Sequence, residues 1–125
     1  MKNIMVLILS IISIGCSYQY RLDFDPSQNS FKRCYKDLPI KELFIADSLD
    51  VVYSLSLIRG EKGSSIIYLC RENPGYNSLT NDVFHFRPNT KYTVYSTDMD
   101  SGVIIILFTD ENATVDSVIN NYRCQ

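Results

Sequence analysis

The sequence predicts an all-β fold, a small antiparallel sandwich of two sheets, and three observations lead to this prediction. Apolar runs of strand length recur about every eight to twelve residues and are separated by turn residues. Aromatic residues are frequent, with nine tyrosines and six phenylalanines in 125 residues. No long stretch has a convincing helical periodicity. Strands without long helices bury their apolar faces by packing sheet on sheet.

The first sixteen residues predict an export leader that precedes the fold. Lys2 supplies a positive charge, residues 4–14 are almost wholly apolar, and Gly15 and Cys16 end the run. The apolar run is about eleven residues, whereas a membrane-spanning helix needs about twenty. The segment Ser13-Ile14-Gly15-Cys16 resembles the bacterial lipobox, with Ser13 in place of the usual leucine. The resemblance implies a signal peptide over residues 1–15 that is cut before Cys16, and a diacylglyceryl group on that cysteine.

Lipidation would place the protein at a membrane outside the cytoplasm. Each buried methylene of the lipid chains contributes about 0.8 kcal/mol, so the anchor holds permanently. Ser17 stands where an aspartate usually signals inner-membrane retention, so we expect the outer membrane, facing the periplasm. A plain secretory signal and an uncleaved anchor are the alternatives. The remaining residues 16–125 are enough for one domain with a very short tether.

Charge and cysteine content narrow the range of functions. The 12 basic and 14 acidic residues give a net charge of −2, without a basic cluster that would indicate nucleic acid binding. Cys34, Cys70 and Cys124 remain for a disulfide, and three thiols allow three different single pairings. No Cys-x-x-Cys pair occurs and His85 is the single histidine, so we expect neither a metal nor a cofactor.

The first half of the domain predicts short strands separated by turns. Residues 18–24 alternate between apolar and polar side chains, as a half-buried strand does. In a second strand, residues 31–35, Phe31 and Arg33 share one face and Lys32 lies on the other. Residues 40–46 predict a short strand, with a single helical turn as the alternative.

Residues 50–59 predict a central strand, and residues 64–71 predict its antiparallel partner across a turn at residues 60–63. The polar loop 72–81 follows and is the expected place for exposed function. Tyr76 in this loop is the first candidate for a partner contact, because tyrosine is frequent in binding surfaces.

Residues 83–95 predict two strands around a proline-containing turn. Phe84 and Phe86 end the first strand, Pro88 and Asn89 form the turn, and Tyr92 lies near the start of the next strand. This arrangement resembles the tyrosine corner of immunoglobulin-like and fibronectin type III sandwiches. The resemblance implies a sandwich of that type, in which the Tyr92 phenol is hydrogen-bonded to the backbone of the turn.

Residues 103–109 are apolar on both faces and predict a strand in the middle of a sheet. The tail, residues 114–125, fits either a helix or a last edge strand. Asp98 and Asp100 in the preceding turn are too few ligands for a calcium site of the EF-hand type. We interpret this turn as solvated, with both carboxylates available to a partner. His85 alternates with two phenylalanines and faces outward, so no catalytic residue is assigned.

The leader, Cys34 after the first strands, and Cys70 ahead of the segment 86–94 resemble a group of small enterobacterial lipoproteins described as type VI secretion immunity proteins. The resemblance implies a Cys34–Cys70 disulfide, which would close a loop of about 36 residues and contribute roughly 3–4 kcal/mol. Cys124 and the tail after Thr109 depart from the pattern. The implied function is not enzymatic: an anchored domain binds a secreted toxin in the periplasm and covers its active site. A structural or adhesive lipoprotein that binds another envelope component is the alternative.

Overall fold

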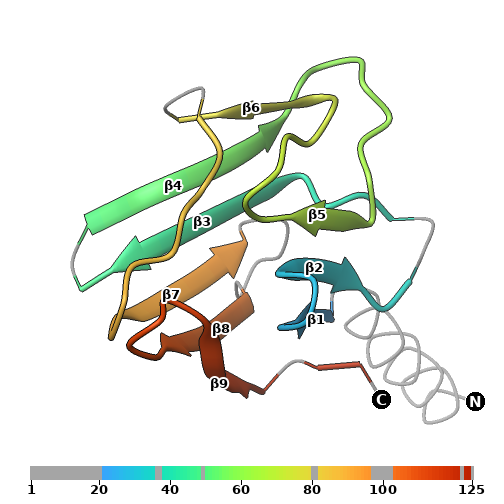
Figure 1. Ribbon diagram of the computed structural model, residues 1–125. Helices are drawn as coiled ribbons and strands as arrows, with labels where there is room; N and C mark the ends of the chain where they lie inside the picture. Colours follow the sequence, from blue (N-terminus) through green and yellow to red (C-terminus); the bar gives the residue numbers. More distant parts are fainter. Residues whose placement is uncertain are drawn as a thin grey trace, which may run out of the picture.

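The protein is an all-β sandwich, as the sequence predicts (Figure 1). The computed structural model describes residues 21–35, 38–48, 50–79, 82–96, 103–121 and 123–124, and within these ranges the chain forms nine strands in two antiparallel sheets. The same ranges contain no helix long and apolar enough to cross a membrane. The predicted lipidation site Cys16 and the predicted partner contacts Asp98 and Asp100 lie outside the described residues.

One sheet has three strands and the other has six. The small sheet has the order β1-β2-β5 and the large sheet has the order β6-β4-β3-β7-β8-β9. Constant-type immunoglobulin sandwiches have seven strands, four in one sheet and three in the other. This chain therefore resembles that class in its two-layer architecture and differs from it in the number of strands per sheet. The strands are β1 (Leu22–Asp25), β2 (Ser30–Arg33), β3 (Glu42–Asp47), β4 (Asp50–Leu57), β5 (Ile66–Tyr68), β6 (Tyr76–Ser78), β7 (Lys91–Ser96), β8 (Val103–Thr109) and β9 (Val115–Asn120).

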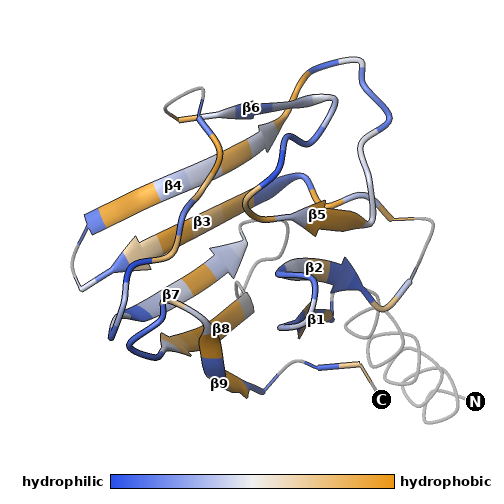
Figure 2. Cartoon of the chain, in the orientation of Figure 1, coloured by the Kyte–Doolittle hydropathy of each residue, from blue (hydrophilic) through white to orange (hydrophobic). Residues whose placement is uncertain are grey.

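The core lies between the sheets, and the alternation along each strand decides which residues enter it (Figure 2). In β2, Phe31 and Arg33 are buried and Lys32 is exposed, which confirms the predicted faces. Strands β3 and β9 settle the two alternatives that the sequence left open, because residues 42–47 form a strand and residues 115–120 form an edge strand. The inner face of the large sheet contributes Leu43, Ile45, Tyr53, Leu55, Tyr92, Val94, Ile105 and Leu107.

The predicted hairpin between residues 50–59 and residues 64–71 is wrong. Strand β4 pairs with β3 and β6, whereas β5 pairs with β2 in the other sheet. The residues between β4 and β5 therefore cross from one sheet to the other. Gly63 in this crossing has a φ of +73°, and a Cβ there would stand 2.8 Å from the Pro39 Cβ. The glycine at this position allows the crossing segment to pass close to Pro39, and it does not form part of a hairpin turn.

The predicted tyrosine corner is confirmed in its central contact. The Arg87 backbone N–H donates a hydrogen bond of 2.8 Å to the Tyr92 hydroxyl. Tyr92 is only 1% exposed, and the rings of Phe84 and Phe86 meet it edge-on with centroids 5.5 Å away. The preceding strand is absent, because residues 82–90 run as an irregular segment. The corner thus depends on the turn and the tyrosine and not on two flanking strands.

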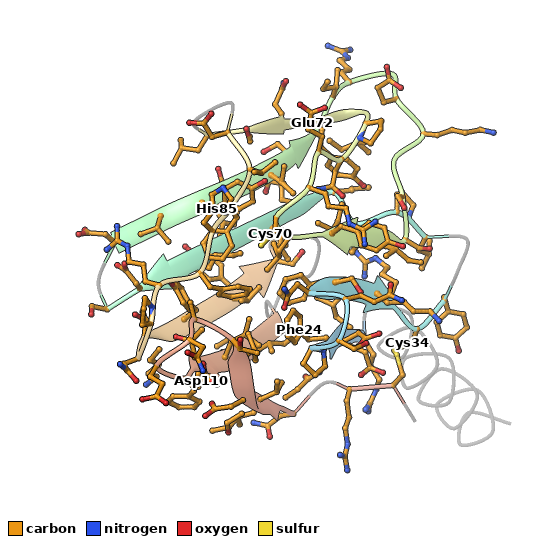
Figure 3. All side chains as sticks on the ribbon, viewed as in Figure 1. Phe24, Cys34, Cys70, Glu72, His85 and Asp110 are labelled. Atoms are coloured by element: carbon orange, nitrogen blue, oxygen red, sulfur yellow. A yellow bond between two sulfur atoms is a disulfide. The ribbon has the colours of Figure 1, made fainter. Side chains whose placement is uncertain are left out.

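The implied Cys34–Cys70 disulfide is wrong, because Cys34 is bonded to Cys124. The tail after β9 runs beside β1, where the Asn120 side-chain amide donates a 2.8 Å hydrogen bond to the Leu22 carbonyl. The Cys124 N–H then donates a 2.7 Å hydrogen bond to the Asp23 carboxylate, which leaves the two bonded cysteines with Cα atoms 5.4 Å apart. Cys70 is a free thiol in the middle of the view in Figure 3, away from Cys34.

Candidate functional site

The outer face of the large sheet carries a continuous apolar surface. The small sheet packs on the inner face, so alternate residues of β3, β7, β8 and β9 point away from the core. Ile104 and Ile119 are 51% and 48% exposed. We call this surface the outer apolar face, and it comprises Phe44, Tyr95, Ile104, Ile106 and Ile119.

Strand register makes the outer apolar face contiguous. Phe44 pairs with Tyr95, and Tyr95 pairs with Ile104, so these three side chains form one row across β3, β7 and β8. Ile106 pairs with Ile119 in a second row. Directly paired side chains have Cβ atoms about 4.5–5.5 Å apart, close enough to exclude water between them. Phe44 and Tyr95 stack with ring centroids 5.2 Å apart.

Polar residues border this apolar centre on β4 and β9, and Thr93 on β7 lies within it as the cross-strand partner of Ile106. Ser54 on β4 is the cross-strand neighbour of Phe44, and Ser117 on β9 lies beyond Ile119 at the next outward position. An apolar centre with aromatic residues and a polar rim is the usual anatomy of a protein–protein interface. Contiguous exposed apolar surfaces are candidates for interaction sites.

Sequence reasoning missed this face although β8 contained the signal. Residues 103–109 are apolar on both faces and predict a strand in the middle of a sheet, which is confirmed because β8 lies between β7 and β9. Its inner residues Ile105 and Leu107 are fully buried, but Ile104 is half exposed. In a two-layer sandwich, outward positions of a strand are normally polar. Isoleucines at the outward positions 104 and 106 therefore indicate, from the sequence, an apolar surface that no second layer covers.

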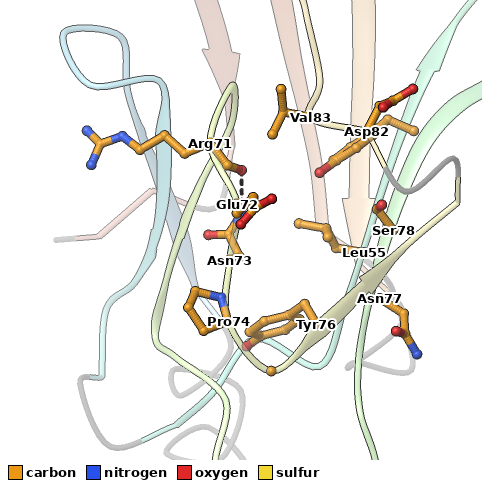
Figure 4. A pocket seen from close by; sticks show the side chains of 12 residues that line it. Leu55, Arg71, Glu72, Asn73, Pro74, Tyr76, Asn77, Ser78, Asp82 and Val83 are labelled. Atoms are coloured by element: carbon orange, nitrogen blue, oxygen red, sulfur yellow. Dashed lines mark hydrogen bonds between the residues drawn. The ribbon is translucent and has the colours of Figure 1, made fainter.

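A second candidate is a pocket of about 570 Å³ beside β6, which we call the β6 pocket (Figure 4). Its volume falls within the range of about 300–1,000 Å³ that is usual for ligand sites. Strands β4 and β6 form one wall and the loop after β5 forms the other. The lining residues are Tyr53, Leu55, residues 71–78, Asp82 and Val83.

Side-chain hydrogen bonds to the backbone hold the walls of the β6 pocket. The Asn73 amide oxygen accepts a 2.9 Å hydrogen bond from the Tyr68 N–H, and its amide nitrogen donates one of 2.7 Å to the Tyr68 carbonyl. The Tyr76 hydroxyl donates a 2.6 Å hydrogen bond to the Ile40 carbonyl and accepts one of 2.9 Å from the Ser64 N–H. The hydroxyl of Tyr76 is thus engaged inside the protein. Its partner contact stays a prediction, and the part of the side chain that lines the pocket is the half-buried ring.

The unengaged charged groups of the β6 pocket are two carboxylates, and Asn77 and Ser78 add neutral groups that can donate or accept. Glu72 and Asp82 are exposed and form no ion pair or hydrogen bond with the described part of the chain. Arg71 also borders the pocket, but its guanidinium lies 4.2 Å from the centre of the Tyr68 ring and points away from Glu72 (Figure 4).

Tyr53 is the most deeply buried polar residue of the β6 pocket. Its side chain is 4% exposed, and its hydroxyl has no hydrogen-bond partner among the described residues. No side-chain oxygen or nitrogen in those residues is both fully buried and unpaired, so the hydroxyl touches open space, and Tyr53 borders both the β6 pocket and a smaller pocket beside His85. Burial raises the pKa of Tyr53, and the neighbouring Cys70 raises it further, so the phenol stays neutral.

Asp110, Cys70 and His85 are the remaining titratable residues of interest outside the two candidate sites. The Asp110 carboxylate accepts hydrogen bonds from the N–H groups of Asn112 and Thr114 and so shapes the turn before β9. Burial raises the pKa of the Cys70 thiol, which keeps it protonated and weakly nucleophilic. His85 is exposed, as predicted. The described residues bring together no group of three His, Cys, Asp or Glu side chains that could hold a metal ion.

Comparison with known proteins adds no family: no protein-family model, no curated protein and no solved structure matches this chain.

Proposed function

We propose that this chain is a lipid-anchored protein of the bacterial envelope that binds another protein and performs no catalysis of its own. Its partner is a secreted toxin, which it neutralises in the periplasm. The exposed outer apolar face is the observation that supports this function best. The net charge of −2 would favour encounter with a basic toxin surface.

The shape of the outer apolar face favours a protein partner over a small molecule. A small ligand needs a concave site that covers most of its surface. The outer apolar face instead spreads across four neighbouring strands, β3, β7, β8 and β9. Aromatic and aliphatic anchors at the centre of such a surface usually contribute most of the binding energy. The stacked Phe44 and Tyr95 rings and the half-exposed Ile104 supply these anchors.

The disulfide supports an envelope location. Structural disulfides persist in oxidising compartments such as the periplasm and are rare in the cytosol. The Cys34–Cys124 bond therefore agrees with the export leader and with lipid attachment at Cys16, the site that the lipobox-like segment indicates. A lipid anchor close to the domain would keep the binding face at the membrane that a toxin must approach.

A growth-protection assay tests this function. The toxins to be tested are secreted effectors encoded by neighbouring genes, each directed to the periplasm of a susceptible strain. We expect the unmodified chain to restore growth and Ile104→Asp to lose protection, because a charge at the centre of the outer apolar face costs at least about 2 kcal/mol of binding. Ser117→Asp places the same charge at the rim and should still protect.

Two results would reject the proposal. Full protection by Ile104→Asp would exclude the outer apolar face, and failure of the unmodified chain to protect would exclude immunity. Binding of a resident envelope component through this face would instead identify an adhesive or structural lipoprotein. Lipidation has a separate test: palmitate labelling of the unmodified chain should be lost in Cys16→Ser, and recovery of the chain with an intact leader would contradict it.

A further inference from the structure

We infer that the β6 pocket is a binding site for a guanidinium group, as found on an arginine side chain. This site goes beyond the outer apolar face and does not depend on the toxin partner. The pocket lies on the inner side of β4 and β6, where the loop after β5 and residues 82–83 cover the sheet (Figure 4).

The first argument is the chemistry of the unused groups. Glu72 and Asp82 offer carboxylate oxygens that are not engaged by the described residues, and Tyr53 offers an unpaired hydroxyl from a side chain that is 4% exposed. Carboxylates are acceptors only, and the phenol oxygen can also accept. The matching ligand is therefore a cation that has several N–H donors and no acceptor, and of the guanidinium and the ammonium only the planar guanidinium can engage two oxygens at once and also stack on a ring.

The second argument is that Arg71, the cationic side chain among the lining residues, and the donors of Asn73 and Tyr76 are engaged by the protein itself. The Asn73 amide nitrogen donates to the carbonyls of Tyr68 and Arg71. The Tyr76 hydroxyl donates to the Ile40 carbonyl, and the Arg71 guanidinium lies over the Tyr68 ring. The negative charge of the pocket is thus left for a ligand to balance.

The third argument is shape and preorganisation. The half-buried ring of Tyr76 lines the β6 pocket, and a planar, weakly hydrated guanidinium stacks well on an aromatic face, whereas the buried Tyr53 contributes its hydroxyl. Both rings are held in place, Tyr53 by the buried core and Tyr76 by its bonds to Ile40 and Ser64. A wall that is already ordered lowers the entropic cost of binding.

Calorimetric titration of the full chain, purified in detergent, tests the site with matched probes. The probes are N-acetylarginine amide, its neutral isostere N-acetylcitrulline amide, and the peptide Gly-Arg-Gly. We expect N-acetylarginine amide to bind at least about tenfold more tightly than the citrulline probe, a difference of about 1.4 kcal/mol. Equal affinity for these two probes, or no binding of either arginine probe at millimolar concentration, would overturn the inference.

Substitutions assign the binding to the pocket. Glu72→Gln should weaken binding of N-acetylarginine amide at least about tenfold, and Tyr53→Phe should weaken it less, because a neutral hydrogen bond contributes less than a charged one. Glu111→Gln removes an exposed carboxylate in the turn before β9 and should bind as the unmodified chain does. Unchanged binding by Glu72→Gln would overturn the inference.

Tighter binding of Gly-Arg-Gly than of the single amino acid would indicate a protein side chain as the natural ligand, and equal binding would indicate a small guanidino compound.

Discussion

The two ends of the sandwich are joined in different ways. At one end, which we call the disulfide end, the tail after β9 is bonded to the segment after β2 by Cys34–Cys124 and by hydrogen bonds to β1. At the other, the β6 end, the crossing segments are held by Tyr76 and Asn73 through hydrogen bonds to the backbone. Both ends leave open space, about 610 Å³ beside Cys124 at the disulfide end and about 570 Å³ in the β6 pocket, so the difference between them is a covalent bond against hydrogen bonds. We therefore expect the two ends to respond differently to substitution.

The largest effect is expected at the disulfide end. Cys34→Ser/Cys124→Ser removes a bond between residues 90 apart in sequence, and the chain-entropy model assigns such a bond about 4–5 kcal/mol of the free energy of unfolding. The midpoint of urea unfolding measures the loss. Cys70→Ser keeps the disulfide and should change stability far less. If the double variant unfolded at the same urea concentration as the unmodified chain, covalent closure would not distinguish the two ends.

The next effect is expected in the crossing that leads to β5. Gly60 and Gly63 both have positive φ, so alanine at either position incurs backbone strain of about 1–2 kcal/mol. A Cβ at Gly63 would also lie 3.0 Å from the Tyr76 hydroxyl, whereas a Cβ at Gly60 meets nothing within 4 Å. Overpacking adds roughly 1–3 kcal/mol, so Gly63→Ala should be the less stable of the two in thermal unfolding. Equal stability would show that the β6 end adjusts freely.

The two structural tyrosines provide a smaller and more local comparison. Tyr76→Phe leaves the buried Ile40 carbonyl and the Ser64 N–H without the hydroxyl, at a cost of about 1–3 kcal/mol. Tyr92→Phe removes one hydrogen bond, from the Arg87 N–H, and should cost less. Amide hydrogen exchange at Ser64 should accelerate in Tyr76→Phe and stay unchanged in Tyr92→Phe. Acceleration in both variants would mean that the corner and the β6 end open together.

The smallest effect concerns pH. Burial raises the pKa of the Cys70 thiol, so the folded protein keeps this proton to a higher pH than the unfolded chain. The contribution to stability is complete below the ordinary thiol pKa of about 8.5–9 and is lost as the pH rises toward the folded value. The fall in the urea midpoint between pH 7 and pH 10 should therefore be smaller in Cys70→Ser. A residual fall is expected because burial also raises the pKa of Tyr53. An identical fall in both proteins would contradict this assignment.

Features that depend on neighbouring residues were predictable from the sequence. Tyr92 and Arg87 are five residues apart, so the chemistry of the intervening turn determines their hydrogen bond. The faces of β2 follow from alternation over three residues, Phe31 to Arg33. Such patterns require no knowledge of what lies across the core.

Features that depend on distant pairing were not predictable. The turn at residues 60–63 shows that the chain changes direction, but it does not show which sheet receives β5. Three cysteines permit three pairings, and only the path of the tail along β1 selects Cys34 with Cys124. The β6 pocket combines β4 with two later segments, and its hydrogen bond from Tyr76 to Ile40 joins residues 36 apart. Its acceptor-rich surface had no sequence motif.

The position of the bonded cysteines affects how the chain can be assembled. A ribosome makes Cys34 and Cys70 before it makes Cys124, so an oxidant that reaches the growing polypeptide finds only the incorrect partner for Cys34. Correct joining then requires either delay until β9 has been made or later exchange through a mixed disulfide. Cells that produce this protein should consequently gain from a disulfide isomerase, and cells that lack one should accumulate a mispaired form in which Cys124 is the reactive thiol.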